Sequence, residues 1–529
     1  MRLVSVFELR DCVIKPNKIN DFSVKRPNII FILTDQQRFD TIHSHGYEWM
    51  ETPNLDRLSS QGFNFHKAYC PAATCTPSRA AIFTGMFAHN SGTYSFQNWG
   101  HQRTFVNDLN EVGYWCSSVG KMHFEPRDVS GGFHERVVVE NPSGTTKWGG
   151  NGDDAWGKYL SFHNRKRENM RHLTDPDWLK KYQGIVWDDD EHLHSDAFVT
   201  NSAIGWMRNH SITRDDPEQP WFLEVGLLGP HEPYSPPQRW LDRYMRRKDL
   251  PAPIAWDDDL STKPAQHKAQ QDFFANCEAE SRIQMAQASP DDIHRMRAHY
   301  YASVSYLDEL IGKLLTEAET LGMLDNTWIV FSSDHGDALG DHRLSYKWLM
   351  YDSMTRVPLI LCPPVSPQKP EHFQSPVSLM DLAPTLLDIA GLSPPPYFDG
   401  HSLLPLMEGA AKEDSLPDAV YCEDNYLLMM RDREGFKIVV YLDGSPGELY
   451  DLTDDPHEEK NLWLSDELSP KRTEMELKVL RWLARSCYKN AAYKCNPDNR
   501  TGGFPGYRWP DNSGHLALIG PGLIEKLPY

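Results

Sequence analysis

The stretch Pro27-Asn28-Ile29-Ile30-Phe31-Ile32-Leu33-Thr34-Asp35 is a continuous apolar run that ends in an acid. Apolar residues without alternation are typical of a parallel strand whose two faces are both covered by helices. Ligands in open α/β sheets bind at the carboxyl ends of such strands. The run therefore predicts an α/β fold with a candidate site at Asp35 and Gln36, although an Asp that follows a strand also suits a helix cap.

Three further apolar segments end in polar residues. They are 114–119, followed by Gly120-Lys121-Met122-His123; 221–228, followed by Gly229-Pro230-His231-Glu232-Pro233; and 326–333, followed by Asp334-His335-Gly336-Asp337, with Lys347 downstream. Taken singly, each of these side chains also suits a solvated position or a loop. Because parallel strands end at the same edge of a sheet, their shared position predicts one site.

Cys75 to Gly85, with the sequence CTPSRAAIFTG, predicts a helix close to these strand ends. Pro77 suits the first helical turn, and Gly85 suits the position after the last turn. Cys75 then lies at the helix N-terminus, which favours anions, and Arg79 follows on the same face one turn later. A sulfur beside a fixed cation is a candidate nucleophile, but the same spacing also suits a buried cysteine with a surface arginine.

Length and charge exclude several functions. The chain has 529 residues, more than one hydrophobic core usually fills, and a formal net charge of -20, which disfavours binding to nucleic acids. The mean hydropathy is -0.57, and no apolar run approaches the roughly 20 residues of a membrane span. Nine cysteines without a CxxC pair show no disulfide or zinc framework.

Composition divides the chain into three parts. We expect an extension over 1–26, a catalytic domain over 27–405 and a C-terminal subdomain with a tail over 406–529, because Pro and Gly concentrate between 391 and 417. Strands are predicted at 419–426 and 435–442, and a covering helix at 470–485. Residues 1–23 do not have the pattern of a signal peptide. The sequence as written therefore predicts a cytoplasmic protein, and a periplasmic or secreted protein is the alternative if its N-terminus is processed.

Cys75-Thr76-Pro77-Ser78-Arg79, followed by Thr84-Gly85, resembles the signature of the type I, formylglycine-dependent sulfatases of the alkaline phosphatase superfamily. The Gly-Lys-x-His, Pro-His-x-Pro and Asp-His segments quoted above, Lys347 and the segment 448–452 are also similar to this family, over roughly residues 27 to 465. The resemblance implies a large mixed, mostly parallel sheet sandwiched by helices, with a smaller C-terminal antiparallel-sheet subdomain.

The resemblance also implies the chemistry of a sulfuric ester hydrolase. In this family a maturation enzyme oxidises the signature cysteine, here Cys75, to formylglycine, whose hydrate is the nucleophile. The residues that match the family's remaining catalytic groups are Lys121 and Lys347 on the sulfate, His231 as proton donor to the leaving oxygen, His123 as acceptor of the hydrate proton, and Arg79 beside the hydrate. A sulfate monoester needs these cations and a proton donor.

The same family binds one divalent metal, and Asp35, Gln36, Asp334 and His335 match its ligands, together with residue 75. The commonest sulfatase set has three carboxylates and an Asn, whereas Gln36 here replaces an Asp and His335 replaces the Asn. Calcium prefers oxygen ligands, and manganese tolerates mixed nitrogen and oxygen. We expect Ca²⁺, with Mn²⁺ or Mg²⁺ as the alternatives.

The tryptophans of the region 127–195 suggest a sulfated carbohydrate as the substrate, and a sulfated small molecule is the wider class. The candidate sugar contacts are Trp148, Trp156, Trp178 and Trp187, which could equally pack the insertion, and Trp99, His101 and Arg103. Two rivals remain open: a phosphonate monoester or phosphodiester hydrolase of the same superfamily, and a non-catalytic binding protein on a sulfatase scaffold. A hydrolase that uses the Cys75 thiolate is a further alternative.

Overall fold

A computed structural model describes residues 25–489, except 97, 141–153, 168–173, 214–215, 259, 262, 366 and 368. Its centre is a sheet with the strand order β10-β2-β9-β7-β1-β6-β4-β5. These strands are β1 (Asn28–Asp35), β2 (Phe63–Phe65), β4 (Trp115–Gly120), β5 (Glu135–Val138), β6 (Trp221–Pro230), β7 (Thr327–Ser333), β9 (Leu359–Cys362) and β10 (Glu371–Phe373). All pairings are parallel except those of β9 with β2 and β7, so the predicted mixed, mostly parallel sheet is confirmed.

The apolar run of β1 is buried on both sides because helices cover both faces of the sheet. Ile29, Phe31 and Leu33 belong to one core cluster, whereas Ile30 and Ile32 belong to another. This alternation follows from the two-residue period of a strand. It explains why the sequence of β1 shows no polar face.

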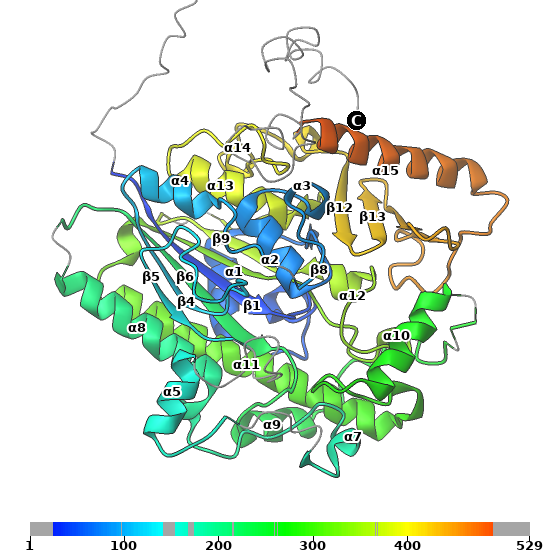
Figure 1. Cartoon of the computed structure of the whole chain (residues 1–529), viewed down its shortest axis with the longest axis horizontal. Coiled ribbons are helices and arrows are strands. Elements are labelled where there is room, and N and C mark those ends of the chain that lie inside the picture. The colour runs from blue at the N-terminus through cyan, green and yellow to red at the C-terminus, as the bar shows by residue number, and fades with distance from the viewer. Residues whose placement is uncertain are drawn as a thin grey trace, which may run out of the picture.

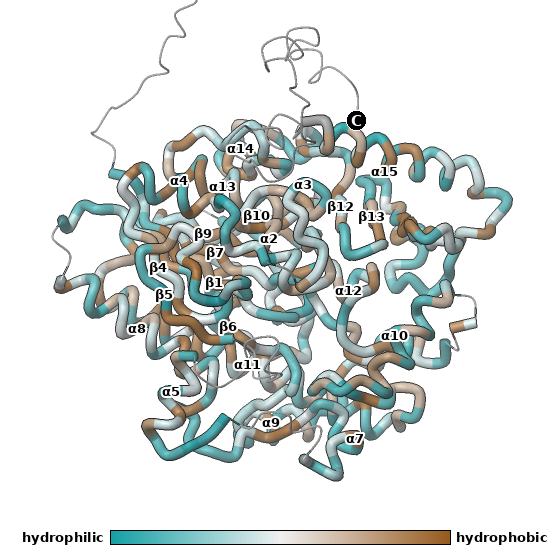
Figure 2. Tube along the Cα trace, viewed as in Figure 1, coloured by the Kyte–Doolittle hydropathy of each residue, from teal (hydrophilic) through white to brown (hydrophobic). Residues whose placement is uncertain are grey.

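The cluster of Ile30 and Ile32 includes residues of three helices, α1 (Pro53–Gln61), α8 (Ser195–Thr213) and α11 (Pro290–Thr320). The cluster of Ile29, Phe31 and Leu33 includes residues of α2 (Cys75–Thr84), α4 (Phe105–Glu111), α13 (Leu382–Ile389) and α14 (Leu404–Met407). Figure 1 shows α8 and α11 below the sheet and α4 and α13 above it. Further helices in the described residues are α3 (Ala88–Ser91), α5 (Ala155–Phe162), α7 (Trp178–Lys181), α9 (Gln238–Met245), α10 (Ala265–Asn276) and α12 (Asp352–Thr355). In Figure 2 the strands of the sheet form the most hydrophobic part of the trace.

Two smaller sheets complete the fold. Short strands β3 (Ala68–Tyr69), β8 (Arg356–Val357) and β11 (Val377–Ser378) form one of them. The second is antiparallel, in the order β12 (Ala419–Asp424), β13 (Leu427–Asp432), β14 (Phe436–Tyr441) and β15 (Glu448–Asp451), and α15 (Ser469–Lys489) packs against it (Figure 1). The predicted antiparallel C-terminal sheet with its covering helix is therefore confirmed, whereas the boundary between 405 and 406 stays a prediction.

Within the described residues, no helix has the length and apolar character needed to cross a bilayer. Residues 1–24 of the predicted extension, Trp148 and the tail from 490 lie outside the described residues.

Candidate active site

The carboxyl ends of four neighbouring parallel strands meet at one edge of the large sheet. Asp35 is the last residue of β1, Lys121 follows β4, His231 follows β6 and Asp334 follows β7. In the sheet these strands are adjacent, in the order β7-β1-β6-β4. The four segments singled out in the sequence therefore lie side by side.

Asp35, Asp334 and His335 form a buried cluster that fits a divalent cation. One ligand atom from each residue lies within 4.8 Å of the others. The Nδ1 of His335 donates to the carbonyl oxygen of Gly336 at 2.8 Å, so its Nε2 presents a lone pair, 3.7 Å from Oδ1 of Asp35 and 3.6 Å from Oδ1 of Asp334. Oδ1 of Asp35 accepts no hydrogen bond from the described residues. A buried acceptor in this state is satisfied when a cation binds it.

Gln36 faces the same cluster, and its hydrogen bonds orient its amide. Its Nε2 donates to Oε2 of Glu232 at 3.0 Å and to Oδ2 of Asp337 at 2.7 Å. Because both carboxylates can accept this N–H pair, the Oε1 is the atom near Lys347, whose Nζ donates to it at 3.1 Å. Gln36 thus presents an oxygen, which suits a hard cation.

Cys75 starts α2 and lies beside Lys347. The helix begins at Cys75 and ends before Gly85, whose φ of 68° is the left-handed value that favours glycine. The Sγ of Cys75 is 3.7 Å from Nζ of Lys347. Burial alone raises the pKa of the thiol, but Lys347 and Lys121 hold this pKa below its ordinary value. The site therefore favours negative charge at position 75.

Lys121 reaches the cluster because two glycines let β4 and β6 approach closely. Its Nζ forms an ion pair with Oδ2 of Asp35. A Cβ on Gly226 would lie 2.2 Å from the carbonyl oxygen of Lys121, and one on Gly120 would lie 2.0 Å from the carbonyl oxygen of Gly226. No larger side chain fits either position without moving the backbone that holds Lys121.

Arg79 links α2 to the metal cluster. Its Nε donates to Oδ2 of Asp334 at 2.7 Å, and its NH1 donates to the carbonyl oxygen of Lys121 at 2.6 Å. The side chain is fully buried, which excludes the alternative of a surface arginine. Arg79 therefore holds Asp334 and Lys121 in place from one turn beyond Cys75.

Two histidines flank the cluster and are neutral in this arrangement. Nδ1 of His231 donates to the carbonyl oxygen of Glu232 at 2.8 Å. Burial, followed by the charges of Lys347 and Lys121, places the pKa of His231 well below its ordinary value. Burial and Lys121 lower the pKa of His123 to about 4. An anion bound between the lysines would offset their charge and raise both pKa values.

Burial excludes Trp99 as a sugar contact, whereas His101 and Arg103 stay predictions. Trp99 is 0% exposed and donates its indole N–H to the carbonyl oxygen of His123 at 2.8 Å, so it positions His123 and offers no face to a sugar. Arg103 pairs with Asp108 and Glu111 of α4, and His101 is exposed. Trp178 is also buried, at 2% exposure, at the start of α7.

Sequence reasoning missed four residues that shape the site. Glu232 and Asp337 orient Gln36, Glu140 accepts a hydrogen bond from the backbone N–H of His123 at 3.0 Å, and the ring of Tyr346 lies 4.4 Å from Nζ of Lys347. Each except Glu140 lies within two residues of a predicted site residue. The short distance along the sequence could have indicated Glu232, Asp337 and Tyr346, whereas no feature of the sequence indicated Glu140.

The family model described as Sulfatase matches residues 27–392, and the model described as N-sulphoglucosamine sulphohydrolase, C-terminal, matches residues 340–484. The chain therefore belongs to the sulfatase family and is a sulfuric ester hydrolase. The resemblance seen in the signature around Cys75 is confirmed.

Its relatives include an arylsulfatase of Clostridium perfringens, 30% identical over 84% of this chain and 91% of the relative. An N-acetylglucosamine-6-O-sulfatase of Bacteroides thetaiotaomicron is 27% identical over 85% of each chain. Among solved structures, a phosphonate monoester hydrolase of Agrobacterium radiobacter has a TM-score of 0.73 at 23% identity, over 87% of this chain and 96% of that one. A protein in complex with its substrate D-glucosamine-2-N,6-O-disulfate has a TM-score of 0.69 at 23% identity, over 90% and 100%. These two likenesses show a shared fold.

Proposed function

We propose that this sulfatase hydrolyses a sulfate monoester of a carbohydrate. In this proposal a separate maturation enzyme oxidises Cys75 to formylglycine, and one divalent cation, Ca²⁺ in the first place, binds at Asp35, Gln36, Asp334 and His335. The carbohydrate is supported by the relative that acts on N-acetylglucosamine 6-O-sulfate and by the structural neighbour that binds a disulfated glucosamine.

The observation that carries the proposal is the state of Lys347. Its ammonium group is fully buried and contacts Gln36, Cys75 and His335, but it forms no ion pair with a carboxylate of the described residues. Burial lowers the pKa of Lys347, yet Cys75, Tyr346 and Asp35 raise it well above its ordinary value, so the group stays charged. A buried ammonium group that forms no direct ion pair with a carboxylate is stabilised further when an anion binds it. A sulfate group beside residue 75 supplies that anion.

The chain's own residues divide the work of hydrolysis. Lys121 and Lys347 bind the sulfate oxygens and offset the charge that grows on them. His231 donates a proton to the leaving oxygen, after the bound sulfate has raised its pKa, and His123 accepts the proton that regenerates the aldehyde. Arg79 fixes Asp334, and Trp99 fixes the backbone of His123.

The metal would be held by the oxygens of Asp35, Gln36 and Asp334 and by Nε2 of His335, with residue 75 beside them. When bound, the cation lowers the pKa of a hydroxyl on residue 75 and neutralises part of the sulfate charge. Nδ1 of His335, held by Gly336, keeps the ring in the orientation that the cation needs.

The test uses protein matured in a host that oxidises the signature cysteine. Mass spectrometry of the peptide with residue 75 reports the conversion of thiol to aldehyde, and turnover is compared for an aryl sulfate, a sulfated sugar and an aryl phosphodiester. We expect the aldehyde, preference for the sulfates, loss of activity with a chelator and no turnover by Cys75→Ala, which should remain folded. Substantial activity in Cys75→Ala, or preference for the phosphodiester, would refute the proposal in favour of a rival chemistry.

A further inference from the structure

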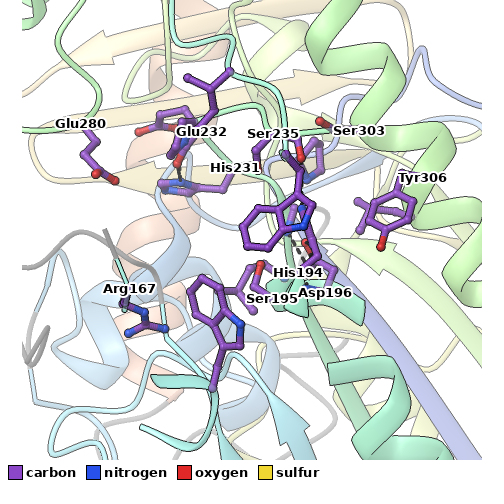
Figure 3. A pocket seen from close by; sticks show the side chains of 18 residues that line it. Arg167, His194, Ser195, Asp196, His231, Glu232, Ser235, Glu280, Ser303 and Tyr306 are labelled. Carbon is purple, nitrogen blue, oxygen red and sulfur yellow. Dashed lines mark hydrogen bonds and ion pairs between the residues drawn. The ribbon is translucent and has the colours of Figure 1, made fainter. Parts of the chain in front are cut away.

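A cavity lies against His231, between residues of the β5–β6 connection, the end of β6 with the loop after it, and α11. Its lining includes Trp156, Arg167, Trp187, His231, Glu232 and Tyr306. Figure 3 shows His231 and Glu232 at the upper wall, with Arg167 and Tyr306 on opposite sides of the pocket. Trp156 and Trp187, two of the candidate sugar contacts of the region 127–195, thus lie on the walls of a cavity that also reaches the proposed proton donor.

If the proposed function holds, the leaving group lies next to this cavity, because its proton donor His231 forms part of the wall. A general acid must lie within hydrogen-bond reach of the oxygen that it protonates. Nδ1 of His231 is engaged by the carbonyl oxygen of Glu232, so the proton must pass from Nε2. The group attached to the leaving oxygen therefore extends along the walls that flank His231.

Arg167 is a buried cation on these walls. Its side chain is 3% exposed, and its guanidinium stacks on the ring of Trp156 with 4.5 Å between Cζ and the ring centroid. Its NH2 donates to Oδ2 of Asp154 at 2.9 Å and to the carbonyl oxygen of Glu140 at 3.2 Å. Its Nε donates to no acceptor among the described residues. The guanidinium is thus fixed through NH2, and its Nε–H is left as a donor.

Asp154 orients Arg167 but also serves other donors. Its Oδ1 accepts from the backbone N–H of Gly157 at 2.8 Å, where it caps α5, and its Oδ2 accepts from the backbone N–H of Glu140 at 3.0 Å. A carboxylate shared in this way neutralises the arginine only in part. Asp154 therefore acts as a positioning residue for the guanidinium.

The carboxyl groups on the cavity walls are already engaged. Asp196 accepts from the backbone N–H groups of Leu228 at 2.6 Å and Gly229 at 3.2 Å. Glu232 accepts from Gln36 at 3.0 Å, and Glu280 has an interaction partner of its own. Arg167 is therefore the wall residue with the clearest capacity for an anion.

We propose that Arg167 binds a second anionic group, a sulfate or a carboxylate, on the saccharide that carries the scissile sulfate. Trp187 contacts the sugar ring, and Trp156 keeps the guanidinium flat against the wall. A charge-assisted hydrogen bond from a guanidinium to such an oxyanion is stronger than a neutral one, and Nε of Arg167 is a donor left for it. The preferred substrate is then a saccharide with at least two acidic groups.

The test measures kcat/KM of the matured enzyme for four aryl sulfates. The leaving group of the first carries no further charge, and those of the other three carry a sulfonate, a carboxylate and a quaternary ammonium group. We expect the wild type to prefer an anionic leaving group to the neutral one, and Arg167→Gln to lose about 10- to 100-fold on the anionic substrates, as for a charge-assisted hydrogen bond. The sulfonate and carboxylate arms show which anion is bound. D-glucosamine-2-N,6-O-disulfate and glucosamine 6-O-sulfate repeat the comparison on a sugar.

Arg165→Gln is the matched control, because Arg165 lies in the same segment but pairs with Asp189 at the exposed surface. It should leave the ratio of anionic to neutral kcat/KM unchanged. If Arg167→Gln is poorly folded, the same ratio is measured in Arg167→Lys, which keeps the charge but loses the Nε donor and the planar contact with Trp156, and should lower the ratio. A wild type that prefers the neutral or cationic leaving group, or a ratio unchanged in both Arg167 variants, overturns the inference. Failure to hydrolyse any of the aryl sulfates and sulfated glucosamines would instead refute the proposed function.

Discussion

Two buried lysines show how a single residue's partners decide its role. Lys437, on β14, forms ion pairs with Asp352 at 2.9 Å and Glu458 at 2.6 Å, and both its stem and its charge are enclosed. Lys347 is equally buried but contacts no carboxylate among the described residues. Lys437 therefore stabilises the native fold through its ion pairs, whereas the charge of Lys347 is available to bind an anionic ligand.

Lys347→Met should therefore separate activity from stability. We expect kcat/KM for an aryl sulfate to fall about 100- to 1,000-fold, as for loss of one donor to a developing oxyanion. The thermal midpoint should shift by less than about 4 °C, because removal of a buried charge offsets the lost hydrogen bond to Gln36. Lys437→Met, the control, should cost about 3–5 kcal/mol of stability, since it strands two carboxylates. A large stability loss in Lys347→Met would contradict this account.

At the scale of elements, the contact between β4 and β6 determines where Lys121 stands. Gly120 and Gly226 face one another across this contact, and Gly120 has a φ of 115°, in the region that favours glycine. The strand pair therefore depends on two positions that carry no chemistry themselves.

Gly226→Ala should cost about 1–3 kcal/mol in the free energy of unfolding, because the new Cβ would lie 2.2 Å from the carbonyl oxygen of Lys121. Denaturant unfolding measures this cost, and kcat should fall with it as Lys121 moves. Gly205→Ala on α8 is the matched control: a Cβ added there would have no atom of the described residues within 4 Å, so the change should stabilise the helix by about 0.5–1 kcal/mol. Equal effects of the two changes would rule out close strand contact as the cause.

Strand β6 also contains Glu224, a buried acid whose ionisation opposes folding. Burial raises the pKa of Glu224 on β6 to about 8, even though Ser118 donates to it at 2.8 Å and Arg79 and Arg136 lower this pKa. The folded pKa lies above the ordinary value of 4.5, so the stabilising contribution is complete below 4.5 and is lost as the pH rises through about 8.

Glu224→Gln should remove this dependence. Relative to the wild type, the variant should gain free energy of unfolding as the pH rises from 4.5 to about 8, by at most about 1.4 kcal/mol per pH unit. Urea unfolding at a series of pH values measures the difference. Parallel pH profiles of the two proteins would show that Glu224 is ionised in the folded state.

At the scale of the whole molecule, the C-terminal sheet supports the segment that leads into α2. Thr74, which precedes Cys75, donates to Oδ2 of Asp424 at 2.6 Å, and the N–H of Glu423 donates to the carbonyl oxygen of Pro71 at 2.8 Å. Cys422 and Met429 belong to the same core cluster as Phe31 of β1. The two sheets therefore share one hydrophobic core.

Because this core is continuous, we expect the large and the C-terminal sheets to unfold together. Differential scanning calorimetry should show one transition, in which near-ultraviolet circular dichroism and activity are lost at the same temperature. Two resolved transitions would mean that the boundary predicted near 405 separates independent folding units.

Much of the fold and the cluster could be predicted from sequence because buried parallel strands have a plain signature. The apolar runs of β1, β6 and β7 end at the polar residues that form the site, and Gly85 marks the end of α2. The strands of two or three residues, such as β3 and β8, are too short to show a period. Trp99 was misjudged because burial depends on distant segments, and the amide orientation of Gln36 depends on Glu232 and Asp337, which only tertiary contact brings near.

Residue 75 is 1% exposed once α2 is packed, so no protein-sized catalyst can touch its sulfur in the finished molecule. The proposed oxidation must therefore happen while the nascent chain is still open. That interval lasts at least until the ribosome has translated Lys347, because the wall beside Cys75 does not exist before then. A cell that makes the chain faster than it oxidises it would accumulate well-folded molecules that can no longer be activated.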